Sequence, residues 1–412
     1  MTQIKKLKGK KILILGFQKE GASTLRFCKK NVLYKKIGVA DVEKKRINDK
    51  GVTFHFGKDY LKAIKNYDVI IKSPGVPLSY IKAKKNQIIT SQSDIFLSNS
   101  KAKIIGITGT KGKSTTTQIL YNIIKKIHKR SFLVGNIGNP PLDYLDKEKE
   151  NDWFIYELSS FQLQTVRKSP HIALILNIYP DHLDQHKSFK EYIMAKENIT
   201  KFQKSTDFLI YNKDNAIVKK IAKKSKAKKI SFKEVTGKNK ILNNINPVLK
   251  VTKILQINKN IVNNGIANFK GLPYRMEYLG KHNGIYFYND SAATIPEATV
   301  FAIKSINNLQ TIIIGGSEKG ADMKSLIDTI KKSKIENIII LGKTPPSLKN
   351  FICNIGKSIY NVSNMKDAVK ICYKNTNKNM ACILSPGFAS FNMFKNYKER
   401  GDLFSKEVLK KQ

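Results

Sequence analysis

Short, continuous apolar runs recur along the chain, and polar segments with glycines separate them. The first run is residues 11–15, and a turn with glycines at positions 16 and 21 follows it directly. The further runs are residues 36–40, 68–72, 103–108, 153–157, 172–177, 311–314, 337–341 and 381–384. Runs of this kind are typical of strands buried on both faces of a parallel sheet, with helices between them. We therefore predict an α/β fold.

The order of the runs predicts three tandem α/β domains. Residues 1–99 show the strand–turn–helix–strand rhythm of a Rossmann-like domain, with Asp41 about twenty residues past the glycine turn, where a ribose hydroxyl needs an acid. The strand at 103–108 opens a central domain of the P-loop ATPase type, residues 100–271. A second Rossmann-like domain is expected at residues 272–412. Lys, Asn and Ile dominate residues 218–263, and the pattern there predicts little.

The segment 108–115, Thr-Gly-Thr-Lys-Gly-Lys-Ser-Thr, follows an apolar strand directly. Glycines let backbone N–H groups turn toward an anion, and the next helix adds the positive end of its dipole. Lys113 could then reach the β- and γ-phosphates, and the Ser114 hydroxyl could hold Mg²⁺. The usual pattern has a glycine where this chain has Ile107. We predict an ATP site made by Gly109, Thr110, Lys111, Gly112, Lys113, Ser114 and Thr115.

Two more candidates for chemistry lie where buried strands end. Glu157 ends the run at 153–157, where a carboxylate beside a phosphate loop could hold Mg²⁺, a cation that prefers oxygen ligands. His182 lies just past the run at 172–177, at the carboxyl edge of the predicted sheet. The other histidines are expected to be helix caps or surface residues: His55, His128, His171, His186 and His282.

The net charge of +44 invites a second hypothesis, a basic nucleic-acid-binding ATPase. Only six of the 75 basic residues are arginine, and the lysines are spread along the whole chain. Base readout and bidentate phosphate contacts depend on arginine, whose planar fork a lysine does not reproduce. We therefore interpret the lysines as solvated surface and expect no nucleic-acid partner, although a basic surface would favour acidic, phosphorylated substrates.

Cysteine usage and hydropathy indicate the compartment. Cys28, Cys353, Cys372 and Cys382 form no C-x-x-C pair, and no histidine lies at zinc-ligand spacing. They are interpreted as buried thiols of a reduced compartment. No apolar run approaches the ~18 residues that a membrane span needs. The sequence thus predicts a cytoplasmic monomer with no membrane partner.

Six motifs follow one another in a characteristic order. They are T-G-T-K-G-K-S-T at 108–115, G-N-I-G at 135–138, E-L-S-S-F-Q-L at 157–163, D-H-L-D at 181–184, N-D-S at 289–291 and S-P-G-F-A-S at 385–390. Together they closely resemble the Mur ligases of peptidoglycan assembly. Within that family the pattern is most similar to the members that add glutamate to UDP-N-acetylmuramoyl-L-alanine. The resemblance extends over essentially the whole chain.

The resemblance implies a mechanism and a metal. The γ-phosphate of ATP would pass to the substrate carboxylate, and the amine of glutamate would then attack the acyl phosphate and release phosphate. Lys113 would stabilise the transferring charge. Ser114 and Glu157 would hold one Mg²⁺, and His182 with Glu157 would serve a second. Lys196 matches a lysine that the family carbamylates, so that it binds metal as an anion.

The resemblance also implies three sets of binding residues. The first domain with two central residues would hold the UDP-linked substrate, through Gly16, Gly21, Asp41, Ser73, Pro74, Gly75, Asn136 and Ser159. Two residues of the last domain, Arg275 and Asp290, would meet ATP when that domain closes. Glutamate would contact Thr294, Lys319, Ser390, Phe391 and Tyr397.

Two departures from the family pattern leave questions open. Residues 290–295 read D-S-A-A-T-I, and Ala292 replaces a lysine of the D-S-K-A-T-N pattern that would pair with a glutamate carboxylate. D-glutamate is the family default, but a subgroup that takes L-glutamate also lacks this lysine, so stereochemistry stays open. Residues 237–243 depart from G-x-H-N-x-x-N, which leaves the adenine contact open.

Other readings are less favoured. Ligases that add a diamino acid usually carry D-N-P-R, which is absent, and folate-polyglutamate ligases lack a UDP-binding first domain. A degenerate scaffold homologue would not need Lys113, Glu157, His182 and Lys196 together, since such groups cluster in working sites. These four are therefore the predicted catalytic residues.

Overall fold

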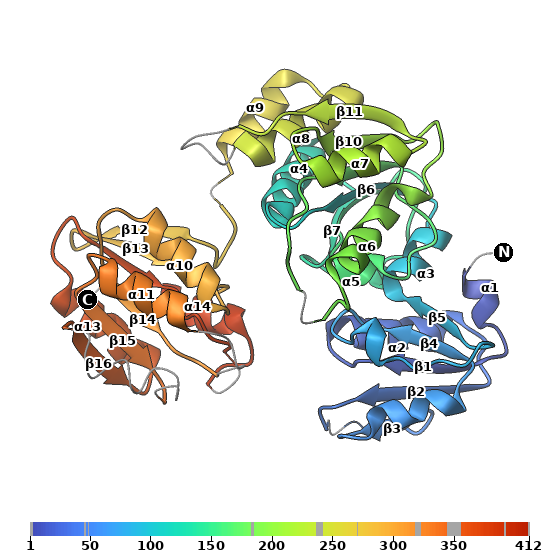
Figure 1. Ribbon diagram of the computed structural model, residues 1–412, viewed down its shortest axis with the longest axis horizontal. Helices are drawn as coiled ribbons and strands as arrows, with labels where there is room; N and C mark the ends of the chain where they lie inside the picture. Colours follow the sequence, from blue (N-terminus) through green and yellow to red (C-terminus); the bar gives the residue numbers. More distant parts are fainter. Residues whose placement is uncertain are drawn as a thin grey trace. The chain divides into compact units, whose positions relative to one another are not determined.

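The computed structural model describes residues 3–44, 47, 49–182, 185–235, 242–269, 271–317, 323–343, 356–390 and 393–410 (Figure 1). Three sheets follow one another along the chain. The chain forms two compact units, residues 1–269 and 270–412. The predicted α/β fold is confirmed, and the first two sheets share the first unit. The domain boundaries at 99/100 and 271/272 stay predictions.

The first sheet has the order β3-β2-β1-β4-β5, and all its strands are parallel. The strands are β1 (Lys11–Leu15), β2 (Lys36–Asp41), β3 (Thr53–Phe56), β4 (Val69–Lys72) and β5 (Ile88–Ser91). Its helices are α1 (Gln3–Leu7), α2 (Lys19–Asn31) and α3 (Gln92–Asn99), with 3₁₀ turns η1 (Tyr60–Asn66) and η2 (Leu78–Tyr80). Because the strand order reverses at β1, the turn after β1 lies where ligands bind in such sheets.

The second sheet has the order β11-β10-β9-β6-β8-β7 and is also wholly parallel. Its strands are β6 (Lys103–Thr108), β7 (Ser131–Gly135), β8 (Trp153–Glu157), β9 (Ile172–Ile175), β10 (Phe208–Asn212) and β11 (Lys228–Phe232). The helices are α4 (Lys113–Ile127), α5 (Ser160–Leu163), α6 (Phe189–Lys201), α7 (Ala216–Lys224), α8 (Leu242–Ile254) and α9 (Lys259–Ala267), with 3₁₀ turn η3 (Pro141–Asp143). Since β6 lies between β8 and β9, the phosphate loop, Glu157 and the segment after β9 share one sheet edge.

The first two sheets pack into one unit through α3. On one side of α3 the ring of Phe96 lies 4.9 Å from that of Phe154 and 5.9 Å from that of Tyr156, both on β8. One buried apolar cluster includes Ile12 and Val69 of the first sheet as well as these β8 residues. Burying such aromatic surface is worth several kcal/mol in total, at roughly 25 cal/mol per Å². The shared core explains why residues 1–269 form a single unit.

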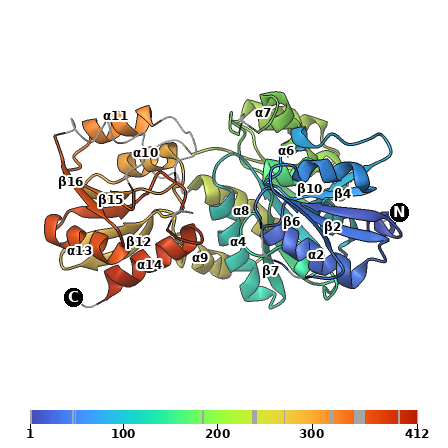
Figure 2. The ribbon, with the colours of Figure 1, turned by 90° about the horizontal axis from the view of Figure 1, so that it is seen from below.

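The third sheet has the order β12-β13-β17-β14-β15-β16, parallel except for the antiparallel pair β12 and β13. Its strands are β12 (Glu277–His282), β13 (Ile285–Asn289), β14 (Leu309–Ile314), β15 (Asn337–Leu341), β16 (Ser358–Val362) and β17 (Ala381–Leu384). Ile312 and Ile314 pack under α10 (Pro296–Ser305) and α11 (Lys324–Lys332). Ile313 faces α13 (Met365–Asn375) and α14 (Tyr397–Leu409), so helices cover both faces (Figure 2).

None of the described helices has the length and apolar composition that a bilayer span requires.

Candidate functional site

The phosphate loop links the end of β6 to the start of α4. Gly112 caps α4 with a φ of 84°, a left-handed conformation that glycine adopts without strain. A Cβ at this position would lie 2.3 Å from Oδ1 of Asn244, on α8. The sequence pattern therefore needs glycine at 112 for both its backbone conformation and the close approach of α8.

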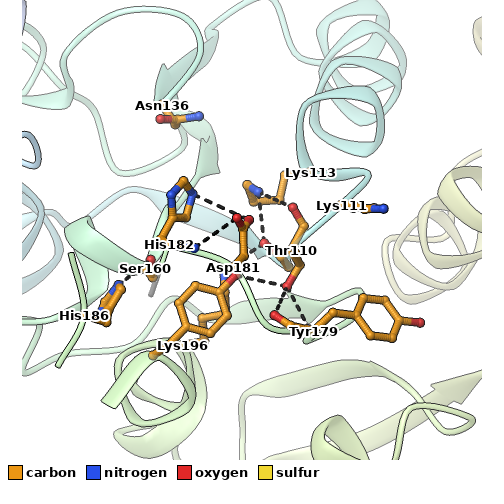
Figure 3. Close-up of polar contacts among 12 residues, drawn as sticks. Thr110, Lys111, Lys113, Asn136, Ser160, Tyr179, Asp181, His182, His186 and Lys196 are labelled. Carbon is orange, nitrogen blue, oxygen red and sulfur yellow. Dashed lines mark hydrogen bonds and ion pairs between the residues drawn. The ribbon is translucent and has the colours of Figure 1, made fainter. Parts of the chain in front are cut away.

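Asn177, two residues past β9, holds the loop. Its Oδ1 accepts the backbone N–H groups of Thr110 (3.1 Å) and Lys111 (2.8 Å), and its Nδ2 donates to the Lys111 carbonyl at 3.1 Å. The Lys113 ammonium donates to the carbonyls of Gly109 (3.0 Å) and Thr110 (2.9 Å) (Figure 3). The sequence analysis missed Asn177, although an amide directly after a strand beside β6 is a usable signal. Ser114 and Thr115 lie half-buried at the start of α4.

Glu157 lies at the same sheet edge with one oxygen satisfied and the other not. It is fully buried and pairs in register with Ile107 of β6. Its Oε1 accepts the side-chain N–H of Asn136 at 2.7 Å, whereas its buried Oε2 has no hydrogen-bond partner. An orphaned buried carboxylate oxygen costs free energy, which a cation at that point would offset. The donor chemistry therefore fits Mg²⁺.

Lys196 extends from α6 to the phosphate loop and is 1% exposed. Its Nζ donates to the Gly109 carbonyl at 2.8 Å and to Oγ1 of Thr108 at 3.4 Å. It also lies 4.8 Å from the centre of the Tyr192 ring. Burial, with the nearby Lys113 cation, lowers the pKa of Lys196 well below its usual value, although Asp181 and Glu157 act in the opposite direction. The site consequently disfavours the charged form of the Lys196 amine.

His182 is placed by the loop after β9. Its φ is 54°, its ring lies 5.2 Å from that of Phe161, and its Nε2 is 3.6 Å from Oδ2 of Asp181. The same loop is tied to the phosphate loop, because Oγ1 of Thr110 accepts the Tyr179 N–H at 3.0 Å and lies 3.0 Å from the Tyr192 hydroxyl (Figure 3). His182 is thus at the predicted edge, half-exposed.

His186 corrects the expectation that it would be a cap or surface residue. It is 2% exposed, lies 3.0 Å from Oγ of Ser160 through Nε2, and stacks on Phe161 with ring centres 4.9 Å apart. Packing of α5 against α6 buries it, which its polar sequence neighbours concealed. Among the described residues, no three His, Cys, Asp or Glu side chains form a metal-ligand group. Mg²⁺ commonly takes only one or two carboxylates and fills its shell with water and phosphate.

The predicted UDP-binding turn has the expected backbone. Gly16 has a φ of 90°, and a Cβ on Gly21 would lie 2.1 Å from the Gly16 carbonyl oxygen. Ser73 donates its hydroxyl to that same carbonyl at 2.8 Å. Pro74 and Gly75 follow in the adjoining turn after β4. The structure therefore brings Gly16, Gly21 and Ser73 together.

Asp41 has a local role that the sequence analysis did not foresee. It is 6% exposed, its Oδ2 accepts the Phe17 N–H, and its Oδ1 accepts the Glu43 N–H at 2.9 Å. One carboxylate oxygen thus holds backbone of the glycine turn, and the other holds the segment after β2. A ribose contact by Asp41 stays a prediction.

Asn136 and Ser159 lie at the edge of the second sheet. Besides its bond to the Glu157 carboxylate, Asn136 donates its backbone N–H to the Glu157 carbonyl at 3.0 Å. Ser159 caps α5, where its Oγ accepts the Gln162 N–H at 3.2 Å. Asn136 therefore orients Glu157, and its contact with a substrate stays a prediction, as does that of Ser159.

The remaining predicted residues lie in the second unit, so ATP contacts by Arg275 and Asp290 stay predictions. Arg275 is exposed. Asp290 accepts the Met276 N–H at 3.1 Å and the Ser385 hydroxyl at 2.8 Å. Burial raises the pKa of Asp290 from 3.8 to about 6.

The predicted glutamate site is described in part. Ser390 is 3% exposed, and the carbonyl of Tyr397 accepts the Ser291 hydroxyl at 2.7 Å. Thr294 is half-buried. Lys319 and Phe391 lie outside the described residues, as do most of residues 237–243. Contacts of this set with glutamate stay predictions.

Arg400, on α14, was missed by the sequence analysis. It is 1% exposed and donates to the Ser291 hydroxyl (3.1 Å) and carbonyl (2.9 Å). It also donates to the carbonyls of Phe388 (3.2 Å) and Gly315 (3.4 Å). The side chain thereby joins the loops that follow β13, β14 and β17.

Two family models match the chain. The Mur ligase middle domain matches residues 107–295, and the Mur ligase, glutamate ligase domain matches residues 274–388. Together the two matches run from the end of β6 to the loop after β17.

Curated relatives align over nearly the whole chain. A UDP-N-acetylmuramoylalanine--D-glutamate ligase of Clostridioides difficile (strain 630) is 33% identical over 452 residues, covering 98% of this chain and 99% of that protein. Another of the same name, from Acetivibrio thermocellus, is 30% identical over 459 residues, covering 98% of this chain and 97% of that protein.

Solved structures share the fold. A UDP-N-acetylmuramate-alanine ligase from Thermotoga maritima has a TM-score of 0.59 at 16% identity, covering 96% of this chain and 98% of that one. A MurF ligase from the same organism, in complex with ADP, has a TM-score of 0.57 at 15% identity, covering 99% and 97%. At these identities the likeness concerns the fold alone.

Proposed function

This chain belongs to the Mur ligase family of ATP-dependent peptidoglycan-synthesis enzymes, and we propose that it joins D-glutamate to UDP-N-acetylmuramoyl-L-alanine. The predicted family resemblance is thereby confirmed. The observation that carries the substrate assignment is the set of relatives bearing that name at 30–33% identity across nearly the full length. The buried carboxylate beside the phosphate loop supports the ATP chemistry.

The reaction would take place in two transfers. An oxygen of the substrate carboxylate forms a bond to the γ-phosphorus of ATP while the bond to the β-phosphate oxygen breaks, which gives an acyl phosphate and ADP. The glutamate amine then forms the C–N bond, inorganic phosphate leaves, and the amine loses a proton. Positioning and charge neutralisation account for most of the rate of such transfers. Lys113, at the end of the phosphate loop, would neutralise developing phosphate charge.

One Mg²⁺ would be held by Ser114 and Glu157, and His182 with Glu157 would serve a second. Lys196 would also be a metal ligand. When bound, Mg²⁺ would neutralise phosphate charge during the transfer. The unpartnered Oε2 of Glu157 supports this assignment. In this scheme Asn136 keeps the other Glu157 oxygen in place.

Lys196 would hold metal only as a carbamate, because an ammonium repels a cation. A neutral amine adds CO₂ with loss of a proton, which gives an N-carboxylate anion. The burial of Lys196, which lowers the pKa of its amine, supports that addition. Its neighbours Tyr192 and the Gly109 carbonyl keep the amine beside the phosphate loop.

The notable departure at Ala292, where the family pattern has a lysine, leaves the choice between D- and L-glutamate to an experiment. The experiment is an enantiomer-resolved assay of the purified protein with ATP, Mg²⁺ and UDP-N-acetylmuramoyl-L-alanine, in which phosphate release and product mass are measured. We expect turnover with D-glutamate. Turnover with L-glutamate alone would assign the L-adding subtype instead.

A separate arm tests the nucleic-acid hypothesis. ATP hydrolysis is measured with single- or double-stranded nucleic acid in place of the amino-acid substrates. We expect no stimulation. Stimulation together with no ligation of either enantiomer would overturn the ligase assignment in favour of a basic nucleic-acid-binding ATPase.

A further inference from the structure

Polar side chains along one face of α2 contact loops of the second sheet. The ammonium of Lys19 donates to the Gly138 carbonyl at 2.6 Å. Further along, Ser23 and Arg26 both donate to Oδ1 of Asp143, at 2.8 and 2.9 Å. Residues three and four positions apart share one helix face, so these contacts form a row. α2 begins in the predicted UDP-binding turn, and the row therefore fixes that turn to the second sheet.

Glu20 belongs to this face but makes a different kind of contact. Its Oε1 accepts the side-chain N–H of Gln162, on α5, at 2.6 Å. Gln162 is 2% exposed, and its Oε1 accepts both the backbone N–H (3.0 Å) and the hydroxyl (3.2 Å) of Ser159. An amide has one donor end and one acceptor end. Glu20 at the nitrogen end and the Ser159 N–H at the oxygen end therefore together set the orientation of the Gln162 amide.

Lys72 supplies the opposite charge. It is the last residue of β4, is 1% exposed, and donates to Oε1 of Gln164 at 3.2 Å and to the Phe161 carbonyl at 3.4 Å. Burial raises the pKa of Glu20 to about 7 and lowers that of Lys72 to about 8, and each charge offsets part of the effect on the other. The next residue, Ser73, donates to the Gly16 carbonyl. The ends of β1 and β4 and the start of α5 thus meet at one polar cluster.

We propose that Glu20 is a positioning residue that, through Gln162, sets Ser159 against the glycine turn and thereby determines affinity for the UDP-linked substrate. This inference rests on the proposed function, because it takes the turn and Ser159 as the two halves of that substrate's site. The hydrogen-bond path from Glu20 through Gln162 to Ser159 joins the halves across a separation of 142 residues between Glu20 and Gln162. Without Glu20 the amide keeps its bond from the Ser159 N–H but loses the acceptor that holds its nitrogen end.

The test is steady-state kinetics on three variants with UDP-N-acetylmuramoyl-L-alanine, ATP and glutamate varied in turn. Glu20→Ala is expected to raise the KM for the UDP-linked substrate about tenfold and to leave the other two KM values within about twofold, since one charge-assisted hydrogen bond is lost. Glu20→Gln keeps a carbonyl acceptor for Gln162 and should restore that KM to within about threefold of the wild type. Arg26→Ala is the matched control, because it removes a contact of the same helix face that does not lead to Ser159.

Equal KM increases in Glu20→Ala and Arg26→Ala, or an equal rise in all three KM values, would overturn the proposal, since both indicate general loosening of α2. An unchanged KM in Glu20→Ala would do the same. If Glu20→Ala does not fold, Glu20→Met takes its place, because it keeps the side-chain volume and lacks the acceptor. Failure of the proposed function is distinguishable: the wild type would then not turn over the UDP-linked substrate at all, whereas it does in every outcome that concerns Glu20 alone.

Discussion

The second and third sheets each carry a buried cation near the carboxyl ends of their strands, and the two cations are held differently. Lys196 donates to the Gly109 carbonyl of the phosphate loop, and burial, with the charge of Lys113, lowers its pKa well below the usual value. Arg400 donates to one hydroxyl and three carbonyls, and burial lowers its pKa only to about 10. The guanidinium keeps its charge at neutral pH, whereas burial beside the Lys113 cation disfavours the charged form of the Lys196 amine. Lys196 is therefore the candidate for a catalytic role, whereas Arg400 joins the loops of the third sheet.

The buried carboxylates at the two sheet edges, Glu157 and Asp290, also differ in how completely they are hydrogen-bonded. Glu157 has an oxygen without a partner, whereas both oxygens of Asp290 accept hydrogen bonds from within the unit. A buried carboxylate with an unpaired oxygen leaves a position for a cation. A carboxylate whose two oxygens both accept hydrogen bonds makes its surroundings more rigid. We therefore expect a cation to bind at the second sheet edge, whereas the polar groups at the third sheet edge hold its loops together.

The largest expected effect is that of Glu157→Gln. The variant keeps an acceptor for Asn136 but removes the charge, so kcat should fall by about 10³-fold or more. Phosphate release under saturating substrates measures this. Asn136→Ala is the companion variant and should lose less, since it disturbs the orientation of the carboxylate and leaves its charge. A Glu157→Gln enzyme within tenfold of the wild type would contradict the predicted cation site.

Arg400→Met tests the other half of the comparison. It leaves several buried carbonyls without donors, which should lower the free energy of unfolding by about 3 kcal/mol. Lys196→Met is the matched control, because replacing a buried amine by an apolar side chain of similar shape should change stability by less than about 1 kcal/mol. Denaturant unfolding measures both. Equal losses in the two variants would remove the distinction between the cations.

Lys196→Ala should lower kcat about 10²-fold through loss of the carbamate anion. Short carboxylates such as formate or acetate should restore part of the activity, and carbon-13 NMR of the wild type under labelled CO₂ should show a carbamate signal. Failure of every small carboxylate to rescue, together with an absent carbamate signal, would count against carbamylation.

The smallest effect concerns the pH dependence of stability at Asp290. Its pKa is raised from 3.8 to about 6, so between these values the folded state binds more protons than the unfolded chain, and stability falls as pH rises through that window. The loss should be at most about 3 kcal/mol, at about 1.4 kcal/mol per pKa unit, and complete above the folded pKa. Asp290→Asn should lack this component. Identical profiles of unfolding free energy against pH for both proteins would refute it.

Local sequence properties were enough to predict the α/β fold and the place of the phosphate loop. A buried parallel strand is apolar over its whole length, and a glycine such as Gly112 is required by its own backbone conformation. Glu157 was predictable for a similar reason, because a carboxylate ending a buried strand is conspicuous. Residues 218–263 resisted prediction, since α8 and α9 are defined by packing against α4 more than by their own pattern.

Only the tertiary structure shows which buried polar groups have all their hydrogen-bond partners and which have one missing. Nothing in the sequence near Arg400 shows that it is buried, because its partners Ser291 and Gly315 are 109 and 85 residues away. Glu20 likewise has the sequence context of an ordinary residue at a helix start, and its partner Gln162 is 142 residues away. The chain by itself determined the strands, the loop and the charged groups. Long-range packing determined the pKa, partners and roles of those groups, since burial and neighbours arise only when distant segments meet.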